Sequence, residues 1–381
     1  MTGIRSSRTS RLRIAFVVHD YNRHIGHSRY VVELATRFHH DHEVHVFTNT
    51  VDATDTPGIT FHHVPAWRPN ALASILSFIV PATLLVRGPF DIVHAQGLCG
   101  FRHNLTTAHI CQRAWFEGLE RMGMRLSWRQ RLFKTFVTPL ERLALCQPAT
   151  RRVIAVSERI RLDLADAYGR TEGVEVIYHG TDNSTFRPDN RTRFRDEVRA
   201  DLGLSNDGFM ALYVGDVKKG AAAAIRATEK VPGVTLLIVS SSDVSYVESL
   251  AASLGVQDRV VFSPHSTRVE KLFAAADAFV FPTIYESFGL VITEAMASGL
   301  PVITNRAAGA AELIDDGVNG LLTDEPWDID QIARHLACLR DNPRLRSEIG
   351  LAARAKVEAY TWDRTAQQTM AVYRKILQEQ A

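Results

Sequence analysis

The sequence is poor in cysteine, has no clear excess of either charge and lacks long apolar runs. Its four cysteines fall in no C-x-x-C or Cys/His spacing, so they predict neither a disulfide framework nor a zinc site. Lys and Arg number 44 against 42 Asp and Glu, which gives no reason to expect nucleic acid as a partner. The most apolar stretch, 71–86, contains Pro81 and is shorter than the ~20 residues of a membrane span. A reducing cytoplasm suits this composition.

The N-terminal residues carry charge without an apolar segment. Arginines 5, 8, 11 and 13 precede the first apolar run, and contact with anionic lipid is an alternative to the solvated arm that we predict for residues 1–10. The run 14–18 is too short for the apolar region of a signal peptide and predicts a strand.

Strand-like and helical runs alternate along nearly the whole chain of 381 residues, which is typical of parallel sheets with crossover helices. In the first half we expect strands at 13–18, 43–48, 91–94, 152–156 and 174–178. The polar stretch 180–206 predicts a connection between domains with a short helix. The pattern then resumes, with strands expected at 209–214, 234–239, 260–262, 278–281, 302–304 and 320–322.

This pattern predicts an α/β fold of two Rossmann-like, doubly wound domains that face each other across a cleft. We place the first domain at 11–185, the second at 186–362 and a final helix at 363–381. Ligands of such sheets bind beyond the carboxyl ends of the strands, so the cleft is the expected site.

The segment 281–303 is the most informative. A strand ends near Phe281, a loop carries Glu286, and a helix begins at Gly289 and stops at Gly299. Glu294 lies about one and a half turns into this helix, so the two carboxylates could bracket one ligand.

The start of this helix predicts an anion site. The N–H groups of Phe288, Gly289 and Leu290 point beyond the strand end, and together with the positive end of the helix dipole they suit a diphosphate. The nearby carboxylates would accept hydrogen bonds from ribose or hexose hydroxyls.

Glu286 and Glu294 have the spacing Glu-x7-Glu. Glu286 lies within the motif Pro-x3-Glu-x-Phe-Gly-Leu, and Glu294 begins the motif Glu-Ala-Met-Ala-x-Gly-Leu-Pro-Val. This pattern resembles the signature of retaining glycosyltransferases of family 4, which have the GT-B fold. The resemblance implies that Glu286 contacts donor-sugar hydroxyls and that Glu294 binds the ribose. It extends to 307–322, whose backbone lines the nucleotide pocket in the family, and to the last helix, which crosses back to the first domain.

A second motif, Gly215-Asp216-Val217-Lys218-Lys219-Gly220, resembles the family segment with Gly-Arg and then Lys-Gly, whose Arg and Lys reach the donor diphosphate. Lys219 carries over as the phosphate cation. Asp216 occupies the position of the Arg, so either Lys218 substitutes for it or Asp216 simply caps the next helix.

In the first domain, Gly26 matches the second of two family glycines at the phosphate or acceptor, and Ile25 replaces the first. His109, at the end of a strand that starts near residue 104, resembles the histidine beside the transferred sugar. His94 is the competing candidate, and a structural histidine is the alternative for both.

The resemblance implies an enzyme that moves a hexose from a nucleotide diphosphate sugar to a glycan or glycolipid in surface polysaccharide assembly. We expect His109, Glu286 and Lys219 in catalysis, and Gly26, Gly215, Lys218, Phe288, Gly289, Leu290 and Glu294 in donor binding. A UDP-sugar is favoured over GDP-mannose. No cofactor and no metal are expected, because Asp328-Ile329-Asp330 fits a helix cap and His39, His40 and His42 fit a solvated loop. Helix 71–86 could dock at the inner face of a membrane.

Three other functions compete with this one. An NAD-dependent oxidoreductase is disfavoured because no G-x-G-x-x-G follows a strand. A noncatalytic nucleotide-sugar binding module on the same scaffold would bind without turnover, and a nucleotide-sugar epimerase would need no acceptor.

Overall fold

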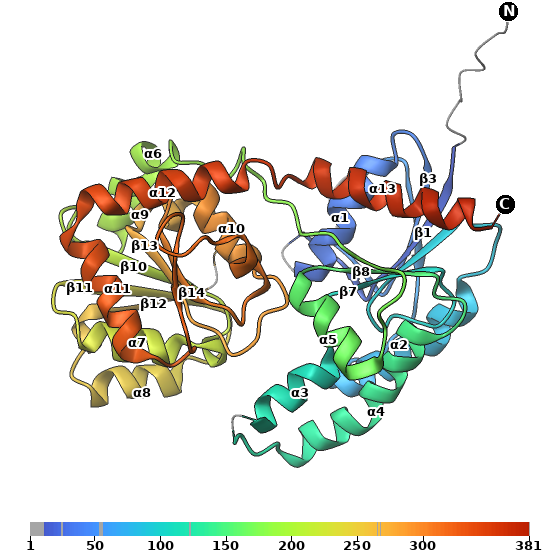
Figure 1. Ribbon diagram of the computed structural model, residues 1–381, viewed down its shortest axis with the longest axis horizontal. Helices are drawn as coiled ribbons and strands as arrows, with labels where there is room; N and C mark the ends of the chain where they lie inside the picture. Colours follow the sequence, from blue (N-terminus) through green and yellow to red (C-terminus); the bar gives the residue numbers. More distant parts are fainter. Residues whose placement is uncertain are drawn as a thin grey trace, which may run out of the picture. The chain divides into compact units, whose positions relative to one another are not determined.

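The computed structural model describes residues 11–23, 26–52, 56–121, 123–264, 266 and 268–380, and the basic arm expected at 1–10 lies outside them. The chain forms two compact units, each with its own sheet (Figure 1). The first contains the residues up to Ala155, Ile160–Ile177 and the residues from Thr365 onward; the second contains Val156–Arg159 and Tyr178–Arg364. The chain therefore enters the second unit before the sequence-based boundary at 185–186.

The first unit is built on a parallel sheet of seven strands. Their order is β5-β3-β1-β6-β7-β8-β9. The strands are β1 Arg13–Val17, β3 Glu43–Thr48, β5 Ile59–His63, β6 Ile92–Gln96, β7 Leu105–Ala108, β8 Arg152–Ala155 and β9 Val174–Val176. Strand β5 was missed in the sequence because it lies at the edge and half of it is polar.

The helices of this unit include the last helix of the chain, α13 (Figure 1). They are α1 Gly26–Phe38, α2 Ala71–Leu85, α3 Gln112–Arg121, α4 Trp128–Cys146, α5 Glu158–Tyr168 and α13 Trp362–Gln378. Helix α13 contributes Tyr373 to the core of the first unit, where the Tyr373 hydroxyl lies 2.8 Å from Nδ1 of His94. Residues from the two ends of the chain thus share one core.

The second unit has a parallel sheet in the order β12-β11-β10-β13-β14-β15. Its strands are β10 Phe209–Val214, β11 Val234–Ser240, β12 Val260–Pro264, β13 Ala278–Phe281, β14 Val302–Asn305 and β15 Leu321–Thr323. Its helices are α6 Asn190–Asp201, α7 Ala221–Glu229, α8 Ser245–Ser253, α9 Val269–Ala275, α10 Leu290–Ala297, α11 Ile329–Asp341 and α12 Pro343–Val357. Every strand expected from the sequence here is present to within one or two residues at each end.

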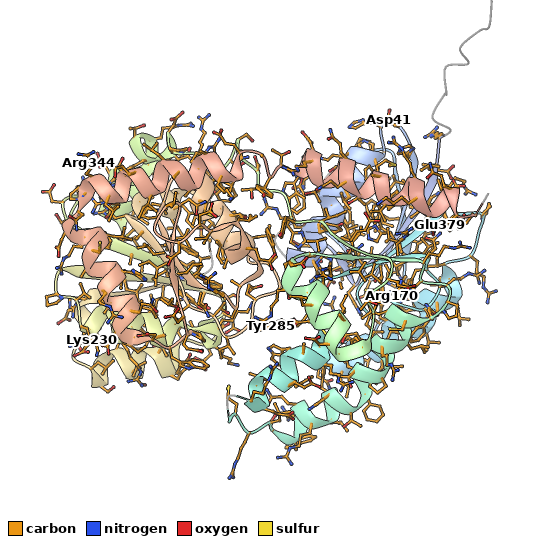
Figure 2. The ribbon with its side chains drawn as sticks, in the orientation of Figure 1. Asp41, Arg170, Lys230, Tyr285, Arg344 and Glu379 are labelled. Carbon is orange, nitrogen blue, oxygen red and sulfur yellow. The ribbon has the colours of Figure 1, made fainter. Side chains whose placement is uncertain are left out.

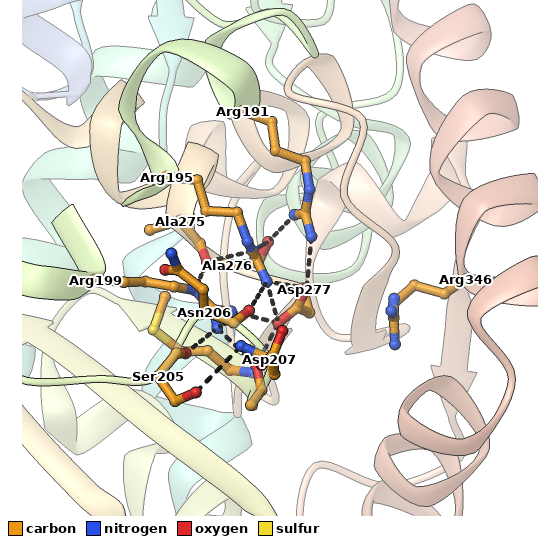
Figure 3. A network of polar contacts seen from close by, with 12 residues as sticks. Arg191, Arg195, Arg199, Ser205, Asn206, Asp207, Ala275, Ala276, Asp277 and Arg346 are labelled. Atoms are coloured by element: carbon orange, nitrogen blue, oxygen red, sulfur yellow. Dashed lines mark hydrogen bonds and ion pairs between the residues drawn. The ribbon is translucent and has the colours of Figure 1, made fainter. Parts of the chain in front are cut away.

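A buried carboxylate fixes helix α6 to the sheet of the second unit (Figure 3). Asp277 is 3% exposed and binds the guanidinium groups of Arg191, Arg195 and Arg199 at 2.8, 3.0 and 2.6 Å. Burial raises the pKa of Asp277, but the hydrogen bonds from Arg191 and the Met210 amide, with the charges of the other arginines, outweigh it and lower that pKa. The cluster lies at the amino ends of β10 and β13, away from the ends where ligands bind such sheets.

A second buried carboxylate, Glu141, joins α3 and α4 in the first unit. It accepts the Gln112 amide, with distances of 3.1 and 2.9 Å to its two oxygens, and the hydroxyl of Tyr168. Burial raises the pKa of Glu141 to about 7, although these hydrogen bonds oppose the shift.

This raised pKa predicts a pH-dependent stability. Because the folded state binds a proton more tightly than the unfolded chain, the free energy of unfolding should fall as pH rises from about 4.5 to about 7, by up to ~3 kcal/mol. Glu141→Gln should remove this slope of the free energy of unfolding against pH, measured by urea unfolding at pH 5 and 7.5. Glu117→Gln on α3, a partly exposed carboxyl, is the control and should keep the wild-type slope. Equal slopes in wild type and Glu141→Gln would contradict the assignment.

Candidate functional site

In the second unit the candidate site lies where the strand order reverses. Strands β10 and β13 are neighbours in the sheet, whereas β11 lies on the other side of β10. The connections after β10 and β13 therefore leave the sheet in opposite directions, and ligands of doubly wound folds bind at this point. The loop after β10 carries Lys219, and the loop after β13 carries Glu286.

The structure brings these two side chains together. The ammonium group of Lys219 forms an ion pair with the carboxylate of Glu286. The two loops are in direct contact, because a Cβ added to Gly220 would lie 1.7 Å from the carbonyl oxygen of Pro282. Only glycine allows this approach. Lys219 is 41% exposed and Glu286 18%, so both remain accessible at the rim of the unit.

Backbone hydrogen bonds hold the loop after β13 in place. The Glu286 amide donates to Ala307 O at 3.0 Å, Gly309 donates to Glu286 O at 2.9 Å, and Ala310 donates to Phe288 O at 2.7 Å. The segment that follows β14 thus fixes the backbone around Glu286. Tyr285, labelled in Figure 2, adds a contact, since the Arg159 guanidinium lies 5.1 Å from its ring centroid.

Helix α10 begins directly after this loop. Its N-cap, Gly289, has φ +96°, and an added Cβ would lie 3.2 Å from Cγ of Glu286, so a larger residue would strain the turn and displace the glutamate. The Phe288 side chain is buried against His179, with a ring distance of 5.1 Å. The first N–H groups of a helix, here those of Leu290 and Val291, have no acceptor within the helix and suit an anion, whereas the Ile292 amide donates to Gly289 O at 3.0 Å. Glu294, further along α10, is 6% exposed.

The residues after β10 take distinct roles. The Gly215 amide donates to Val239 O at 3.0 Å and extends the sheet. Asp216 accepts the Lys218 amide at 3.0 Å and caps the short 3-10 helix Val217–Lys219, which explains an acid at this position without a ligand. The side chain of Lys218 is exposed, and only Lys219 of the two lysines pairs with Glu286.

In the first unit the two candidate histidines differ in accessibility. His94 is fully buried between the Tyr373 hydroxyl and the Thr107 hydroxyl, at 2.8 and 2.6 Å, and burial lowers its pKa to about 3. It is a structural histidine. His109 follows β7, is partly exposed, and lies 2.8 Å from Oε1 of Gln96 through Nε2. Gly26 begins α1, and a Cβ added there would meet nothing within 4 Å.

Comparison with known proteins identifies the fold and the family. Residues 194–356 match the family described as glycosyl transferases group 1, and residues 25–185 match Glycosyltransferase Family 4. The chain is a family 4 glycosyltransferase.

Relatives of this glycosyltransferase cover nearly its whole length. D-inositol 3-phosphate glycosyltransferase 1 of Catenulispora acidiphila is 28% identical over 395 residues, covering 93% of this chain and 91% of the relative. WaaG, a glycosyltransferase involved in lipopolysaccharide biosynthesis, has a TM-score of 0.79 at 22% identity, covering 93% of this chain and 98% of its own. Anabaena HepE in complex with UDP-glucose has a TM-score of 0.73 at 21% identity, covering 96% and 100%. These structures confirm the expected GT-B fold.

Two polar residues in the first unit of the glycosyltransferase were not predicted as site residues from the sequence. Gln96 ends β6 and His19 follows β1, and these two strands are neighbours at the reversal point of the first sheet. Gln96 is 4% exposed and its Nε2 has no protein acceptor among the described residues, while burial lowers the pKa of His19 to about 4. Their positions at the ends of adjacent strands were the available signal.

The described residues of the glycosyltransferase offer neither a metal cluster nor a membrane-spanning helix. They contain no group of three or more His, Cys, Asp or Glu side chains arranged to hold a metal ion. Asp328 accepts the Gln331 amide at 2.9 Å, as the predicted helix cap requires. No helix in the described part of the chain combines the length and apolar character needed to cross a bilayer.

Proposed function

We propose that the glycosyltransferase moves a hexose from a nucleotide diphosphate sugar, with a UDP-sugar favoured over GDP-mannose, to a hydroxyl of a glycan or glycolipid acceptor. The ion pair of Lys219 with Glu286, beside the start of α10 at the reversal point of the sheet, carries this proposal. UDP-glucose in the HepE structure supports a UDP-sugar as the donor.

The chemistry follows from the charges at this site. When the bond between C1 and the phosphate oxygen breaks, its electron pair leaves with the diphosphate, and Lys219 with the amides of Phe288, Gly289 and Leu290 would stabilise that charge. A diphosphate beside Lys219 would compete with Glu286 for the ammonium group and leave that carboxylate to accept sugar hydroxyls. In this assignment Glu294 binds the ribose, and neither a metal nor a cofactor takes part.

The acceptor hydroxyl would form the new bond to C1 and pass its proton to the departing phosphate. We propose that it enters on the face that the diphosphate leaves, which retains the anomeric configuration. His109, with Gln96 beside it, would hydrogen bond the acceptor or the sugar 6-hydroxyl. Buried His94 would have no such role.

The surface of the first unit supports an acceptor presented at the inner face of a membrane. Helix α2 has 15 residues without a charge, of which only Phe78, Ile79 and Ala82 are buried. Val80 and Leu84 are 60% and 52% exposed. Apolar surface of this kind typically marks an interaction site.

A donor panel tests the proposal. A matching UDP-, GDP- or ADP-sugar at 100 times its Kd should raise the free energy of unfolding by ~2.7 kcal/mol, seen as a raised Tm. Glu294→Ala should weaken nucleotide binding, whereas Glu286→Ala should mainly slow transfer.

Glu348→Ala, which changes an exposed glutamate on α12, is the matched control and should change neither nucleotide binding nor the rate of transfer. Binding of a donor without transfer to any acceptor would favour a noncatalytic module, and conversion of the donor sugar without an acceptor would favour an epimerase. Unchanged kinetics in both glutamate variants would remove the site assignment.

A further inference from the structure

The first unit contains a preformed apolar cavity to which none of the steps proposed above assigns a role. It has a volume of about 710 Å³ and opens between the beginnings of α2, α3 and α4. Its apolar walls include Leu72, Ile110, Trp115, Phe116, Leu132 and Phe133. The volume falls within the range of sites for small organic ligands.

The walls of this cavity are held by hydrogen bonds at the start of each helix. Asn70 caps α2 by accepting the Ala73 amide at 3.0 Å. Ser127 and Gln130 form a reciprocal capping box at the start of α4, and Glu141 accepts the amide of Gln112, the first residue of α3. A ligand would therefore meet walls that are already ordered, which lowers the entropic cost of binding.

Part of the cavity wall comes from the segment that follows His109 in the sequence. Ile110 and Gln112 follow His109 in the same connection after β7, and both line the cavity. A lining residue of the cavity therefore directly follows the histidine proposed to contact the acceptor.

The charge carried by the described lining residues of the cavity is positive. Arg129 is the charged side chain among the described lining residues, and its guanidinium lies 5.3 Å from the ring centroid of Trp128, which is 70% exposed. Arg125 and Arg131 are exposed close by in sequence. In the part of the chain that the structure describes, these three arginines form no ion pair with an acidic side chain, so they suit an anionic group.

We propose that this cavity binds the hydrocarbon chain of the acceptor, and that the acceptor is a lipid whose phosphate lies beside Arg129. The apolar walls and the adjacent cations match the two parts of such a molecule. This inference rests on the proposed function and names the class of its acceptor.

Dodecyl phosphate below its critical micelle concentration is a suitable probe, measured by calorimetry and by quenching of tryptophan fluorescence. Wild type should bind one molecule saturably. Leu132→Asp should weaken binding at least about tenfold, because it places a charge against the chain. Phe136→Asp, one turn further along α4, is the control. Phe136 is 48% exposed and Leu132 is 44% exposed, but Phe136 does not line the cavity. The affinity of this variant should therefore stay within about twofold of the wild-type affinity.

The head group is tested separately. Arg129→Ala should weaken the binding of dodecyl phosphate but not that of dodecyl maltoside. Inorganic phosphate alone should not bind measurably. Thermal melting and donor binding confirm that each variant is folded.

Equal losses of affinity for dodecyl phosphate in Leu132→Asp and Phe136→Asp would indicate nonspecific surface adsorption and overturn the inference. Dimerisation that buries Leu132 would overturn it as well, and so would the absence of binding by wild type. If wild type binds no alkyl phosphate but still transfers sugar to a soluble acceptor, only this inference fails. If it binds alkyl phosphate but no nucleotide sugar, the proposed function fails instead.

Discussion

Replacing Lys219 by alanine should lower kcat for sugar transfer by roughly 100- to 1,000-fold, the loss that follows removal of one preorganised group that stabilises developing negative charge. Lys219 is the cation that the structure places against Glu286 beside the start of α10. Steady-state transfer kinetics with the donor found in the panel would measure the effect. Donor affinity should fall as well, because the ground-state diphosphate is also anionic.

Two lysine variants make this result specific. Lys218→Ala should lower kcat by less than about tenfold, because the Lys218 side chain is exposed and, of the two lysines, only Lys219 pairs with Glu286. Lys230→Ala, at the other end of α7 (Figure 2), removes an exposed pair with Asp330 and should leave kcat unchanged. A larger loss from Lys218→Ala than from Lys219→Ala would reverse the assignment of the phosphate cation.

Replacing Asp277 by alanine should destabilise the protein by about 3–5 kcal/mol, because three arginines would lose the carboxylate that neutralises them in and around a buried site (Figure 3). Arg199 is 1% exposed and cannot turn to water. Urea unfolding would show the loss. Since the pKa of Asp277 is lowered, its contribution should be complete above about pH 4 and fall as pH drops further.

Asp330→Ala is the matched control for this change. It also removes an aspartate from an ion pair in the second unit, but the Asp330 side chain is 67% exposed and water screens the pair, so the free energy of unfolding should change little. If Asp277→Ala cost no more than Asp330→Ala, α6 would be held by its apolar contacts rather than by the arginine cluster.

The sequence predicts the strands of the second unit, and the loops after β10 and β13 as the place of a ligand site, for a simple physical reason. Apolar runs mark buried parallel strands, and residues just after neighbouring strands meet at one edge of the sheet. The same rule could not separate His94 from His109, because both occur near strand ends. What separates them is burial by Tyr373, a residue 279 positions away from His94.

Other features stayed hidden because their partners are distant in sequence. Arg191, Arg195 and Arg199 lie on one face of a helix by spacing alone, but three strands and three α-helices separate that helix from Asp277 in the sequence. The cavity of the first unit likewise forms only when three helix starts converge.

The return of α13 to the first unit also constrains the order of events during synthesis. Tyr373 fills the core beside Phe38 and His94, so that core remains incomplete while the ribosome translates the whole second unit. The second unit can fold as soon as its own residues emerge, whereas the first unit must wait for the final helix although its strands were made earlier. Truncation before α13 should therefore damage the half of the protein that was made first.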